Sequence, residues 1–370
     1  MNDYYCNQKF WWLNVDLEKH QQYSCCSATP SDIDFSWLER NTGKIFNTPL
    51  LQEERTMMLS NLPVNSCQDT CFIPESRGLT SRRLFENGRN QTHIDITATP
   101  TTLNIVMGST CNLTCVYCCK QYSSAWLRDI QQHGPYLDHN RYRVFPIDLA
   151  KKHSQTRETK EYKLLENELF AMTLDSVHIS GGEPFLYNNL TDIVTNLKAT
   201  EIRINTGLGV DPVRFKNQLD KIKHITNLKV LISVETQNEL YEFIRFGNSY
   251  QNFEKNLQTV LNSGVKYQLV SVVSNVTILG LLDLYTKDHP WHFLLCGDPD
   301  YLAINVMDNT TKQTVIQKLE NSSIPIRNEL MQNLQVPYTE DQHKNCSSYL
   351  NEFAKRRNLS LNVLPQSFHQ

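Results

Sequence analysis

Three cysteines stand close together in Cys111-Asn-Leu-Thr-Cys115-Val-Tyr-Cys118, directly after a predicted strand at 102–107. Thiolates are the usual protein ligands of iron–sulfur clusters, and three of them leave one iron of a [4Fe–4S] cube without a protein ligand. An open coordination position is typical of catalytic metal sites, whereas structural sites are closed. The spacing therefore favours a catalytic iron–sulfur site, and it leaves open a zinc site or three unrelated cysteines.

A second motif that could bind a ligand is Ser180-Gly181-Gly182-Glu183-Pro184, which lies at the end of a predicted strand at 176–180. Two glycines let a backbone approach a ligand closely, and a carboxylate can accept hydrogen bonds from an ammonium group. A lone Gly-Gly usually marks a turn. Its position at the end of a strand that follows the cysteine loop favours a ligand-binding role.

Six short β-rich runs and six amphipathic helical runs alternate from about residue 100 onward, which is typical of βα units with a parallel sheet. The predicted strands are 102–107, 176–180, 201–205, 229–234, 267–273 and 301–307, and the predicted helices are 160–174, 190–198, 213–222, 250–261, 278–286 and 312–319. Six units fall short of an eight-fold barrel, so we predict an α/β fold with a partial, open (β/α)6 TIM-like barrel. Chemistry in such barrels sits at the C-terminal strand ends, where both motifs lie.

Composition excludes several other classes of protein. The chain has 370 residues, 40% hydrophobic and 20% charged, with a net charge of −3. These values are those of a globular protein of about two domains, and they give no electrostatic footprint for nucleic acid. We find no secretory signal and no apolar run that could span a membrane, so we expect no membrane partner and a cytoplasmic location. The 11 cysteines, an odd number, argue against a complete disulfide framework.

The cysteine loop resembles that of the radical S-adenosylmethionine (SAM) superfamily, in which an aromatic residue, here Tyr117, precedes the last cysteine. The resemblance implies that Cys111, Cys115 and Cys118 bind a [4Fe–4S] cluster. It also implies that Gly181, Gly182 and Glu183 receive the methionine amino group of SAM.

The segment around the fourth predicted strand is similar to that of anaerobic sulfatase-maturating enzymes and their relatives. In those proteins a serine and an arginine twelve residues later hold the SAM carboxylate, and the resemblance gives these roles to Ser233 and Arg245. The alternative for Arg245 is an ion pair with Glu242 on a helix surface. Asn205 falls where the family has polar contacts to the ribose.

The resemblance also implies a mechanism. SAM would bind the open iron, an electron donor such as flavodoxin or ferredoxin would reduce the cluster, and a 5′-deoxyadenosyl radical would abstract a substrate hydrogen.

The first segment is similar to the twitch domain, a shortened SPASM domain that holds an auxiliary [4Fe–4S] cluster. The resemblance implies four ligands, which are Cys6, Cys25, Cys67 and Cys71, with Cys26 as the alternative to Cys25. Cys67 and Cys71 are separated by three residues where two are usual. A structural zinc site on the same thiolates is the alternative. We assign no cofactor to Cys26, Cys119, Cys296 and Cys346.

We therefore expect a small N-terminal iron–sulfur domain at 1–95, a radical SAM barrel at 96–310 and a helical extension at 311–370. The expected function is a radical SAM oxidoreductase that oxidises or rearranges an unactivated C–H bond in a small molecule such as a sugar or alcohol, with the auxiliary cluster as electron acceptor. One alternative is the modification of a ribosomally made peptide or protein. Another is a non-catalytic iron–sulfur or zinc-binding protein, because one fold hosts many functions.

Overall fold

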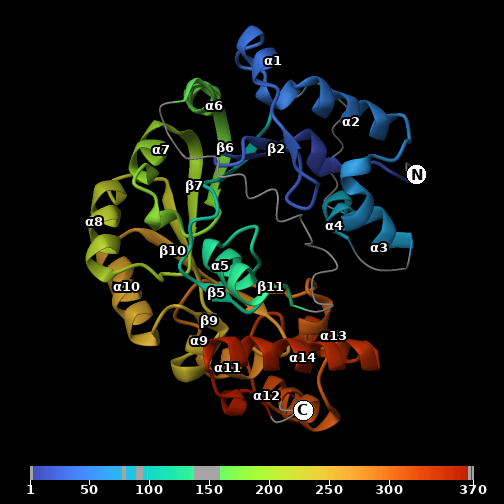
Figure 1. The fold of residues 1–370 in the computed structure, drawn as a ribbon, viewed down its shortest axis with the longest axis vertical. Helices are drawn as coiled ribbons and strands as arrows, with labels where there is room; N and C mark the ends of the chain where they lie inside the picture. The colour runs from blue at the N-terminus through green and yellow to red at the C-terminus, as the bar shows by residue number, and fades with distance from the viewer. Residues whose placement is uncertain are drawn as a thin grey trace. The chain divides into compact units, whose positions relative to one another are not determined.

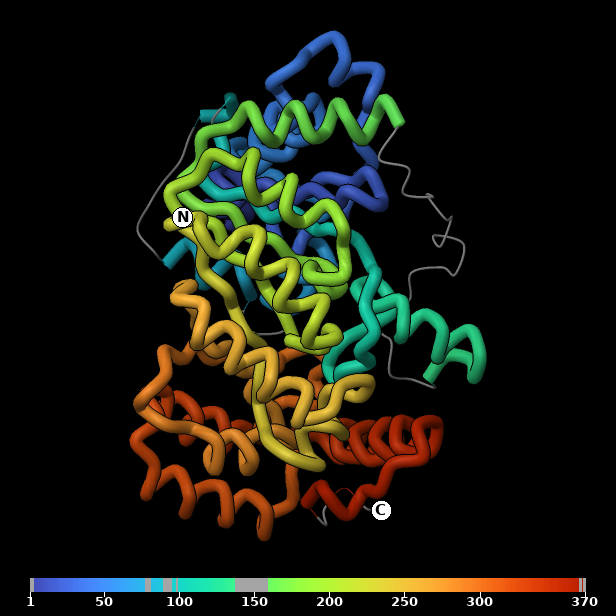
Figure 2. The backbone as a smooth tube through the Cα atoms, turned by 90° about the vertical axis from the view of Figure 1, so that its left-hand side faces the viewer, coloured from blue at the N-terminus to red at the C-terminus, as the bar shows by residue number. Residues whose placement is uncertain are grey.

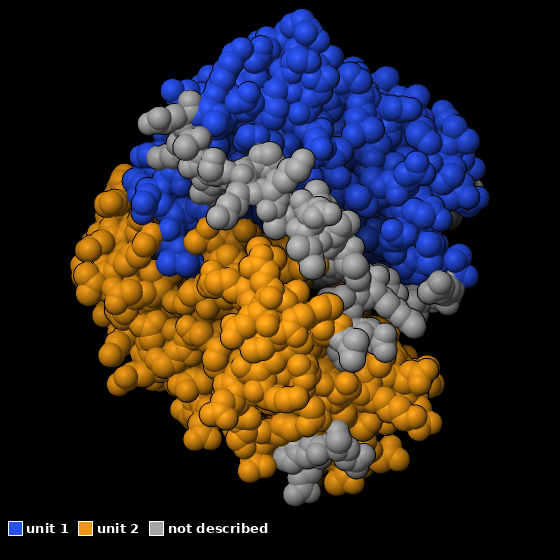
Figure 3. Space-filling view, in the orientation of Figure 1, with its two compact units in different colours: residues 1–108, 150–204, 225–228 blue, residues 109–149, 205–224, 229–370 orange. Residues whose placement is uncertain are grey.

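The computed structural model describes residues 3–76, 81–88, 95–97, 99–136, 159–365 and 368. The chain forms two compact units, coloured separately in Figure 3. Unit 1 comprises residues 1–108, 150–204 and 225–228, and unit 2 comprises residues 109–149, 205–224 and 229–370. The glycine-rich motif therefore lies in unit 1 and the cysteine loop in unit 2. The domain boundaries near residues 95 and 310 stay predictions.

Among the described residues, unit 1 contains six strands that pair side by side in the order β7, β6, β4, β1, β2, β3. Figure 1 labels β2, β6 and β7. The strands of unit 1 are β1 (Trp12–Asp16), β2 (Gln21–Tyr23), β3 (Ser31–Asp32), β4 (Thr102–Val106), β6 (Thr173–Ser180) and β7 (Lys198–Thr206). Its helices are α1 (Phe35–Arg40), α2 (Pro49–Leu59), α3 (Ile73–Ser76), α4 (Arg82–Asn87), α6 (Lys160–Ala171) and α7 (Leu190–Asn196). The strands β7, β6, β4 and β1 are parallel, whereas β2 pairs antiparallel with β1 and β3 pairs antiparallel with β2.

The N-terminal segment contributes its strand β1 to this sheet. β1 pairs with β4 over its full length, from Trp12 opposite Thr102 to Asp16 opposite Val106. The sequence did not indicate this pairing, because it joins residues far apart in the chain.

The two faces of the unit 1 sheet differ in polarity, because successive side chains of a strand point to opposite faces. One face is apolar and buried and carries Leu13, Val15, Leu103, Ile105, Val177, Ile179, Ile202 and Ile204. The opposite face, here called the polar face, carries Trp12, Asn14, Asn104, Ser176, His178, Ser180, Glu201 and Arg203. A sheet that is polar on one face suits the lining of a ligand-binding space.

Unit 2 contains three parallel strands, β8 (Leu228–Ser233), β10 (Lys266–Val273) and β11 (Trp291–Leu295), and the short antiparallel pair β5 (Thr114–Cys115) and β9 (Arg245–Phe246). Its helices are α5 (Ser124–His133), α8 (Pro212–Ile222), α9 (Asn238–Ile244), α10 (Tyr250–Ser263), α11 (Ile278–Leu284), α12 (Asn309–Glu320), α13 (Arg327–Leu334) and α14 (Glu340–Arg357). The last helix, drawn in red in Figure 2, packs in one apolar core with residues of α5, α9, α11, α12 and α13.

The predicted α/β class is confirmed, and five of the six predicted strands are present as β4, β6, β7, β8 and β10. The six predicted helices are also present, as α6, α7, α8, α10, α11 and α12. Local sequence signals explain this agreement. In α8, for example, Asp211 caps the helix by accepting hydrogen bonds from the backbone N–H groups of Val213 and Arg214, each at 3.0 Å, and Pro212 occupies the first turn.

The sixth predicted strand, 301–307, is wrong. The chain there forms a short 3-10 turn at Asp300–Leu302 and then runs irregularly through the unit 2 core. The Asn275 side chain donates to the carbonyl oxygens of Tyr301, at 3.0 Å, and of Val306, at 2.8 Å, and so provides partners that a neighbouring strand would otherwise supply. The sixth strand is β11 instead, which pairs with β10.

In the part of the chain that the structure describes, no helix combines the length and apolarity needed to cross a membrane.

Candidate functional site

The cysteine loop is anchored by the pairing of β5 with β9, in which Cys115 lies opposite Arg245. Cys115 is buried, whereas Cys111 and Cys118 are half-buried. The backbone N–H of Cys118 donates to the carbonyl oxygen of Cys115 at 2.9 Å, which closes a tight turn between the last two cysteines. Three cysteines are therefore held on one short, tightly turned loop.

Two glycines allow neighbouring loops to approach the cysteine loop. Gly247 has φ of +108°, and a Cβ atom there would lie 2.4 Å from the carbonyl oxygen of Asn112. The Asn112 side chain donates to the carbonyl oxygens of Gly209, at 2.8 Å, and of Gly247, at 3.3 Å. These contacts tie the start of the loop to the segments after β7 and β9.

Arg245 is fully buried and forms a two-pronged ion pair with Glu235. Its Nε donates to Glu235 Oε2 at 2.8 Å and its Nη2 to Oε1 at 2.6 Å, while Nη1 lies 3.6 Å from the Cys115 sulfur. The guanidinium also lies 5.7 Å from the ring centre of Tyr117. Arg245 is thus not paired with Glu242 on a helix surface. It contacts two other predicted site residues, Cys115 and Tyr117.

The ionisation of these groups reflects burial and the Arg245 charge. Burial alone would lower the pKa of Arg245, but the charge of Glu235 outweighs it and holds the pKa well above its ordinary value. Burial raises the pKa of the Cys115 thiol, and the nearby Arg245 opposes that rise. Burial also raises the pKa of Cys118. A bound metal group would have to displace these thiol protons, and Arg245 favours the thiolate at Cys115.

Ser233 and Asn205 lie at the C-terminal ends of β8 and β7. Ser233 is the last residue of β8, and Asn205 is the last but one of β7; both are half-buried. Within the described ranges, neither side chain bonds to Arg245 or to the cysteine loop.

The glycine-rich motif lies at the C-terminal end of β6 in unit 1. Gly181 and Gly182 have φ of +84° and +56°. A Cβ atom on Gly181 would lie 2.5 Å from the Val106 side chain and 2.9 Å from the carbonyl oxygen of Gly108. Glu183 is buried, and its carboxylate accepts from the backbone N–H of Phe185 at 3.2 Å. The turn therefore requires glycine both for its backbone angle and for space.

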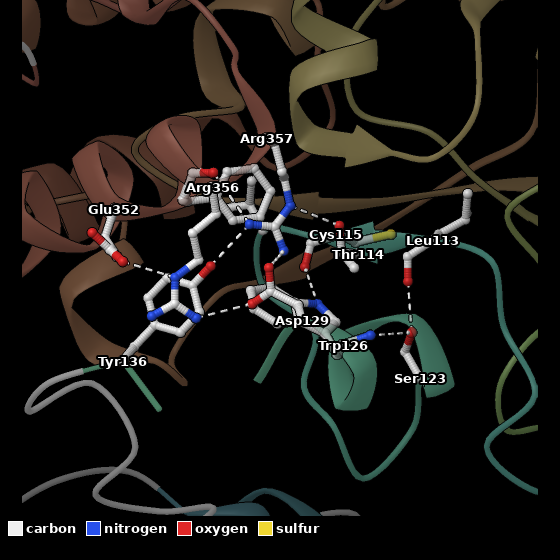
Figure 4. Close-up of polar contacts among 12 residues, drawn as sticks. Leu113, Thr114, Cys115, Ser123, Trp126, Asp129, Tyr136, Glu352, Arg356 and Arg357 are labelled. Carbon is white, nitrogen blue, oxygen red and sulfur yellow. Dashed lines mark hydrogen bonds and ion pairs between the residues drawn. The ribbon is translucent and has the colours of Figure 1, made fainter. Parts of the chain in front are cut away.

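Two side chains of the α5 segment brace the cysteine loop (Figure 4). Ser123, the N-cap of α5, donates to the carbonyl oxygen of Leu113 at 2.6 Å, and the Trp126 indole donates to that of Cys115 at 3.0 Å. The loop backbone is consequently fixed by side chains that follow it in sequence.

The predicted auxiliary ligands lie in unit 1 and are all buried. Cys6, Cys67 and Cys71 share one small apolar cluster with Met58, Val64 and Phe72. Burial raises the pKa of Cys6 to about 12, and the charges of Cys67 and Cys71 add to that rise. Burial likewise raises the pKa of Cys67.

Cys25 and Cys26 differ in their surroundings. The Cys25 thiol is buried and donates to Gln8 Oε1 at 3.0 Å, whereas Cys26 is exposed. The interaction of the two neighbouring thiols raises the pKa of Cys25 and lowers that of Cys26 to about 6. The charge of Cys6, one of the other predicted ligands, also raises the pKa of Cys25.

A buried ion pair lies beside these cysteines. Lys9 Nζ is 2.6 Å from Glu54 Oε2 and donates to Ser66 Oγ at 2.9 Å. The charges of Glu54 and Cys67 raise the pKa of Lys9 despite its complete burial.

In the described ranges, no three His, Cys, Asp or Glu side chains are arranged to hold a single metal ion.

Two features of the site were missed at the sequence level. Glu235 follows Ser233 in the sequence, but nothing in its type or spacing indicated that it pairs with Arg245. The polar face was signalled only by the alternation along β1, β4 and β6. On that face Asn104 donates to Asn14 Oδ1 and accepts from Ser180 Oγ, each at 2.9 Å.

Residues 105–288 match the model of the radical SAM superfamily. The match includes the cysteine loop, the glycine-rich motif, Ser233 and Arg245, and this part of the chain belongs to the radical SAM superfamily. Membership implies a [4Fe–4S] cluster that binds SAM.

Two curated relatives are similar to this chain. The GTP 3′,8-cyclase of Synechocystis sp. is 24% identical over 173 residues, which are 46% of this chain and 45% of the relative. A probable GTP 3′,8-cyclase of Methanococcus aeolicus is 27% identical over 187 residues, 49% of this chain and 53% of the relative. The chain therefore spans about half the length of the curated relatives that it matches.

Solved structures with some likeness include anSMEcpe with bound AdoMet, at 19% identity and a TM-score of 0.36, with 60% of each chain covered. Another is Streptococcus suis SuiB bound to precursor peptide SuiA, at 13% identity and a TM-score of 0.38, with 84% of this chain and 65% of the other covered.

Proposed function

We propose that this protein is a radical SAM enzyme that uses the cysteine loop as its catalytic metal centre. The observation that carries the proposal is the loop with three thiols, of which Cys115 lies 3.6 Å from the buried cation Arg245. A cluster ligated by thiolates carries negative charge, and a buried cation beside one ligand stabilises that charge. The donor set of Cys111, Cys115 and Cys118 suits a [4Fe–4S] cluster with one open iron.

When bound, the cluster and SAM would supply one-electron reduction of the sulfonium and a 5′-deoxyadenosyl radical that abstracts a substrate hydrogen. The protein's own residues position these groups. Arg245 Nη1 is the one guanidinium nitrogen that Glu235 does not engage, and we assign it to the SAM carboxylate together with the Ser233 hydroxyl. Asn205 is assigned to the ribose.

The assigned role of the glycine-rich turn is to receive the SAM amino group. Gly181 and Gly182 are half-buried and can offer backbone carbonyl oxygens, and Glu183 supplies a buried carboxylate that can accept from an ammonium group.

We further propose that Cys6, Cys25, Cys67 and Cys71 hold an auxiliary [4Fe–4S] cluster. The support is their shared burial and the mutual influence of their charges, together with the exposure of Cys26. Four thiolates complete the coordination of a cube, so this cluster would transfer electrons and not bind SAM.

For the substrate we propose a small molecule such as a sugar or alcohol. The polar face supports this, because its amide, hydroxyl and imidazole groups suit a ligand with several hydroxyls. Both curated relatives are named for a reaction of GTP, which is also a small molecule. The proposed reaction is an oxidation or rearrangement at an unactivated C–H bond. Modification of a peptide is the alternative, and the substrate experiment below separates the two.

The test of the enzyme class is SAM cleavage by anaerobically reconstituted protein with dithionite. We expect 5′-deoxyadenosine to form, and Cys118→Ala to abolish it. The matched control is Cys119→Ala, which removes the neighbouring buried thiol and should retain cleavage. A fully loaded protein that forms no 5′-deoxyadenosine would contradict the proposal and favour a non-catalytic metal protein.

The test of the substrate class is stimulation of 5′-deoxyadenosine formation. Candidate sugars, alcohols and GTP are compared with unstructured peptides, each deuterated at carbon. We expect deuterium to enter 5′-deoxyadenosine from a small molecule. Deuterium from a peptide alone would overturn the small-molecule assignment.

A further inference from the structure

The last helix of unit 2 reaches the cysteine loop through two side chains. The Tyr349 hydroxyl donates to the carbonyl oxygen of Val116 at 2.5 Å, and Arg357 Nε donates to Thr114 Oγ1 at 3.0 Å. These contacts flank the bond from Trp126 to the carbonyl oxygen of Cys115. Three consecutive loop residues, 114 to 116, are therefore each held by a side chain from another element.

Tyr349, Phe353 and Arg357 form a stripe along one side of α14, because residues four apart lie on the same side of a helix. Phe353 packs between the other two: its ring centre is 6.0 Å from that of Tyr349 and 3.8 Å from the Arg357 guanidinium. Tyr349 also packs against Tyr136, with ring centres 5.3 Å apart. The aromatic packing limits the movement of both polar groups.

The Arg357 guanidinium is held on several sides, as Figure 4 shows. Nη1 donates to the Tyr136 hydroxyl at 2.8 Å, and Nη2 lies 3.2 Å from Asp129 of α5. The Trp126 ring centre is 4.8 Å away. Only 3% of the side chain is exposed. An arginine restrained in this way is a rigid donor, so Thr114 cannot shift without breaking a buried bond.

We propose that Tyr349 and Arg357 are positioning residues for the radical SAM site. They act through the loop backbone: by fixing residues 114 to 116 they set the direction of the Cys115 thiol and of the turn to Cys118. A loop that is ordered before its cofactor arrives loses less conformational freedom on binding, so the cluster is held more tightly. This inference rests on the proposed function of the cysteine loop.

Arg356 provides a matched comparison within the same helix. It is also buried, with 5% of its side chain exposed, and it shares Asp129 with Arg357 at 3.1 Å. It also contacts Glu352, at 2.8 Å, and the carbonyl oxygen of Gly134, at 2.8 Å, and its guanidinium lies 3.9 Å from the ring centre of Tyr136. It makes no bond to residues 113 to 118. Packing of α14 against α5 can therefore be separated from contact with the loop.

The experiment measures iron release to a chelator from reconstituted full-length protein. The irons of the cysteine loop are identified as those that a Cys115→Ala variant lacks. In Tyr349→Phe and Arg357→Lys we expect these irons to leave about tenfold faster, as is typical when a residue that orients a metal ligand is lost. The SAM-induced change in the EPR spectrum of the reduced cluster should weaken as well. Arg356→Lys should match the parent in both readouts.

Thr114→Val tests the same contact from the loop side, and it is informative even if Arg357→Lys fails to fold. It should accelerate release of the same irons. Parent-like release from folded Tyr349→Phe and Thr114→Val would overturn the positioning role. Equal acceleration in Arg356→Lys would also overturn it, because helix packing would then suffice. A parent that binds no more iron than Cys115→Ala would overturn the proposed function itself, and that outcome is seen before any of the positioning variants is tested.

Discussion

Cys115 and Arg245 lie directly opposite each other in the β5–β9 pairing, and the Arg245 Nη1 atom is 3.6 Å from the Cys115 sulfur. A predicted metal ligand and a predicted SAM contact, 130 residues apart in sequence, are thus joined by a backbone pairing. The orientation of the arginine is set by Glu235, whose carboxylate occupies the other side of the guanidinium.

Loss of the Glu235 charge should destabilise the protein. In Glu235→Gln the buried Arg245 would keep its charge without a counterion, which costs about 3–5 kcal/mol for a broken buried pair. Urea unfolding of the cofactor-free protein measures this change. The control is Glu242→Gln, an exposed carboxylate on the neighbouring helix α9, for which we expect a change below about 1 kcal/mol. Similar losses in the two variants would contradict the importance of the Glu235–Arg245 pair.

Alanine at Gly181 should reduce the stability of the fold more than alanine at another glycine with a similar backbone angle. Gly181 and Gly264 have φ of +84° and +76°, but a Cβ atom meets Val106 at 2.5 Å only at Gly181, whereas nothing lies within 4 Å at Gly264. We expect Gly264→Ala to cost about 1 kcal/mol, from the left-handed backbone alone. Gly181→Ala should cost at least about 2 kcal/mol more, from the clash. Thermal unfolding of both variants makes the comparison.

The adjacent cysteines Cys25 and Cys26 should differ in their contribution to iron binding. Cys25→Ala removes a buried thiol whose pKa is influenced by the predicted ligand Cys6, so iron content after reconstitution should fall from about eight to about four per chain. Cys26→Ala removes an exposed thiol and should leave the content unchanged. The reverse result would make Cys26 the ligand. Binding of one zinc in place of four irons would favour the structural zinc site.

Stability should fall in mild acid because of His178. Burial, helped by the charge of Arg203, lowers the pKa of His178 from 6.5 to about 4. Between these values the unfolded chain binds a proton that the folded chain does not. The stability contributed by the neutral His178 is therefore complete above pH 6.5 and is lost as the pH falls toward 4.

Urea unfolding at pH 7.0 and 4.5 measures the effect. His178→Gln should reduce the loss of stability between the two pH values by about 2 kcal/mol. The control is His224→Gln, which replaces an exposed histidine. This variant should lose as much stability between the two pH values as the parent does. An unchanged loss in His178→Gln would show that other groups govern the acid response.

Features encoded by local sequence could be predicted well. The β-rich run at 267–273 predicted β10, and Asp211-Pro212 predicted the start of α8. Both signals depend on residues within a few positions of one another. The spacing of Cys111, Cys115 and Cys118 identified the loop for the same reason. These signals need no knowledge of distant contacts.

Features that depend on distant contacts could not be predicted. The apolar run at 301–307 resembles a strand, but Asn275 and the core around α14 bind it as an irregular segment. The partner of Arg245 was predicted as either SAM or Glu242, since the buried Glu235 was not recognisable from spacing. The contacts of Tyr349 and Arg357 with the loop span more than 200 residues.

The pairing of β1 with β4 makes the N-terminal segment a covering for the rest of unit 1. Without β1, the backbone N–H of Thr102 and C=O of Val106, which bond to residues next to β1, would lie on an open strand edge, which other chains can recruit into intermolecular sheets. The segment that carries Cys6 and Cys25 thus also protects its neighbour from aggregation. Mutations that weaken β1 would therefore reduce solubility even where every cysteine is intact.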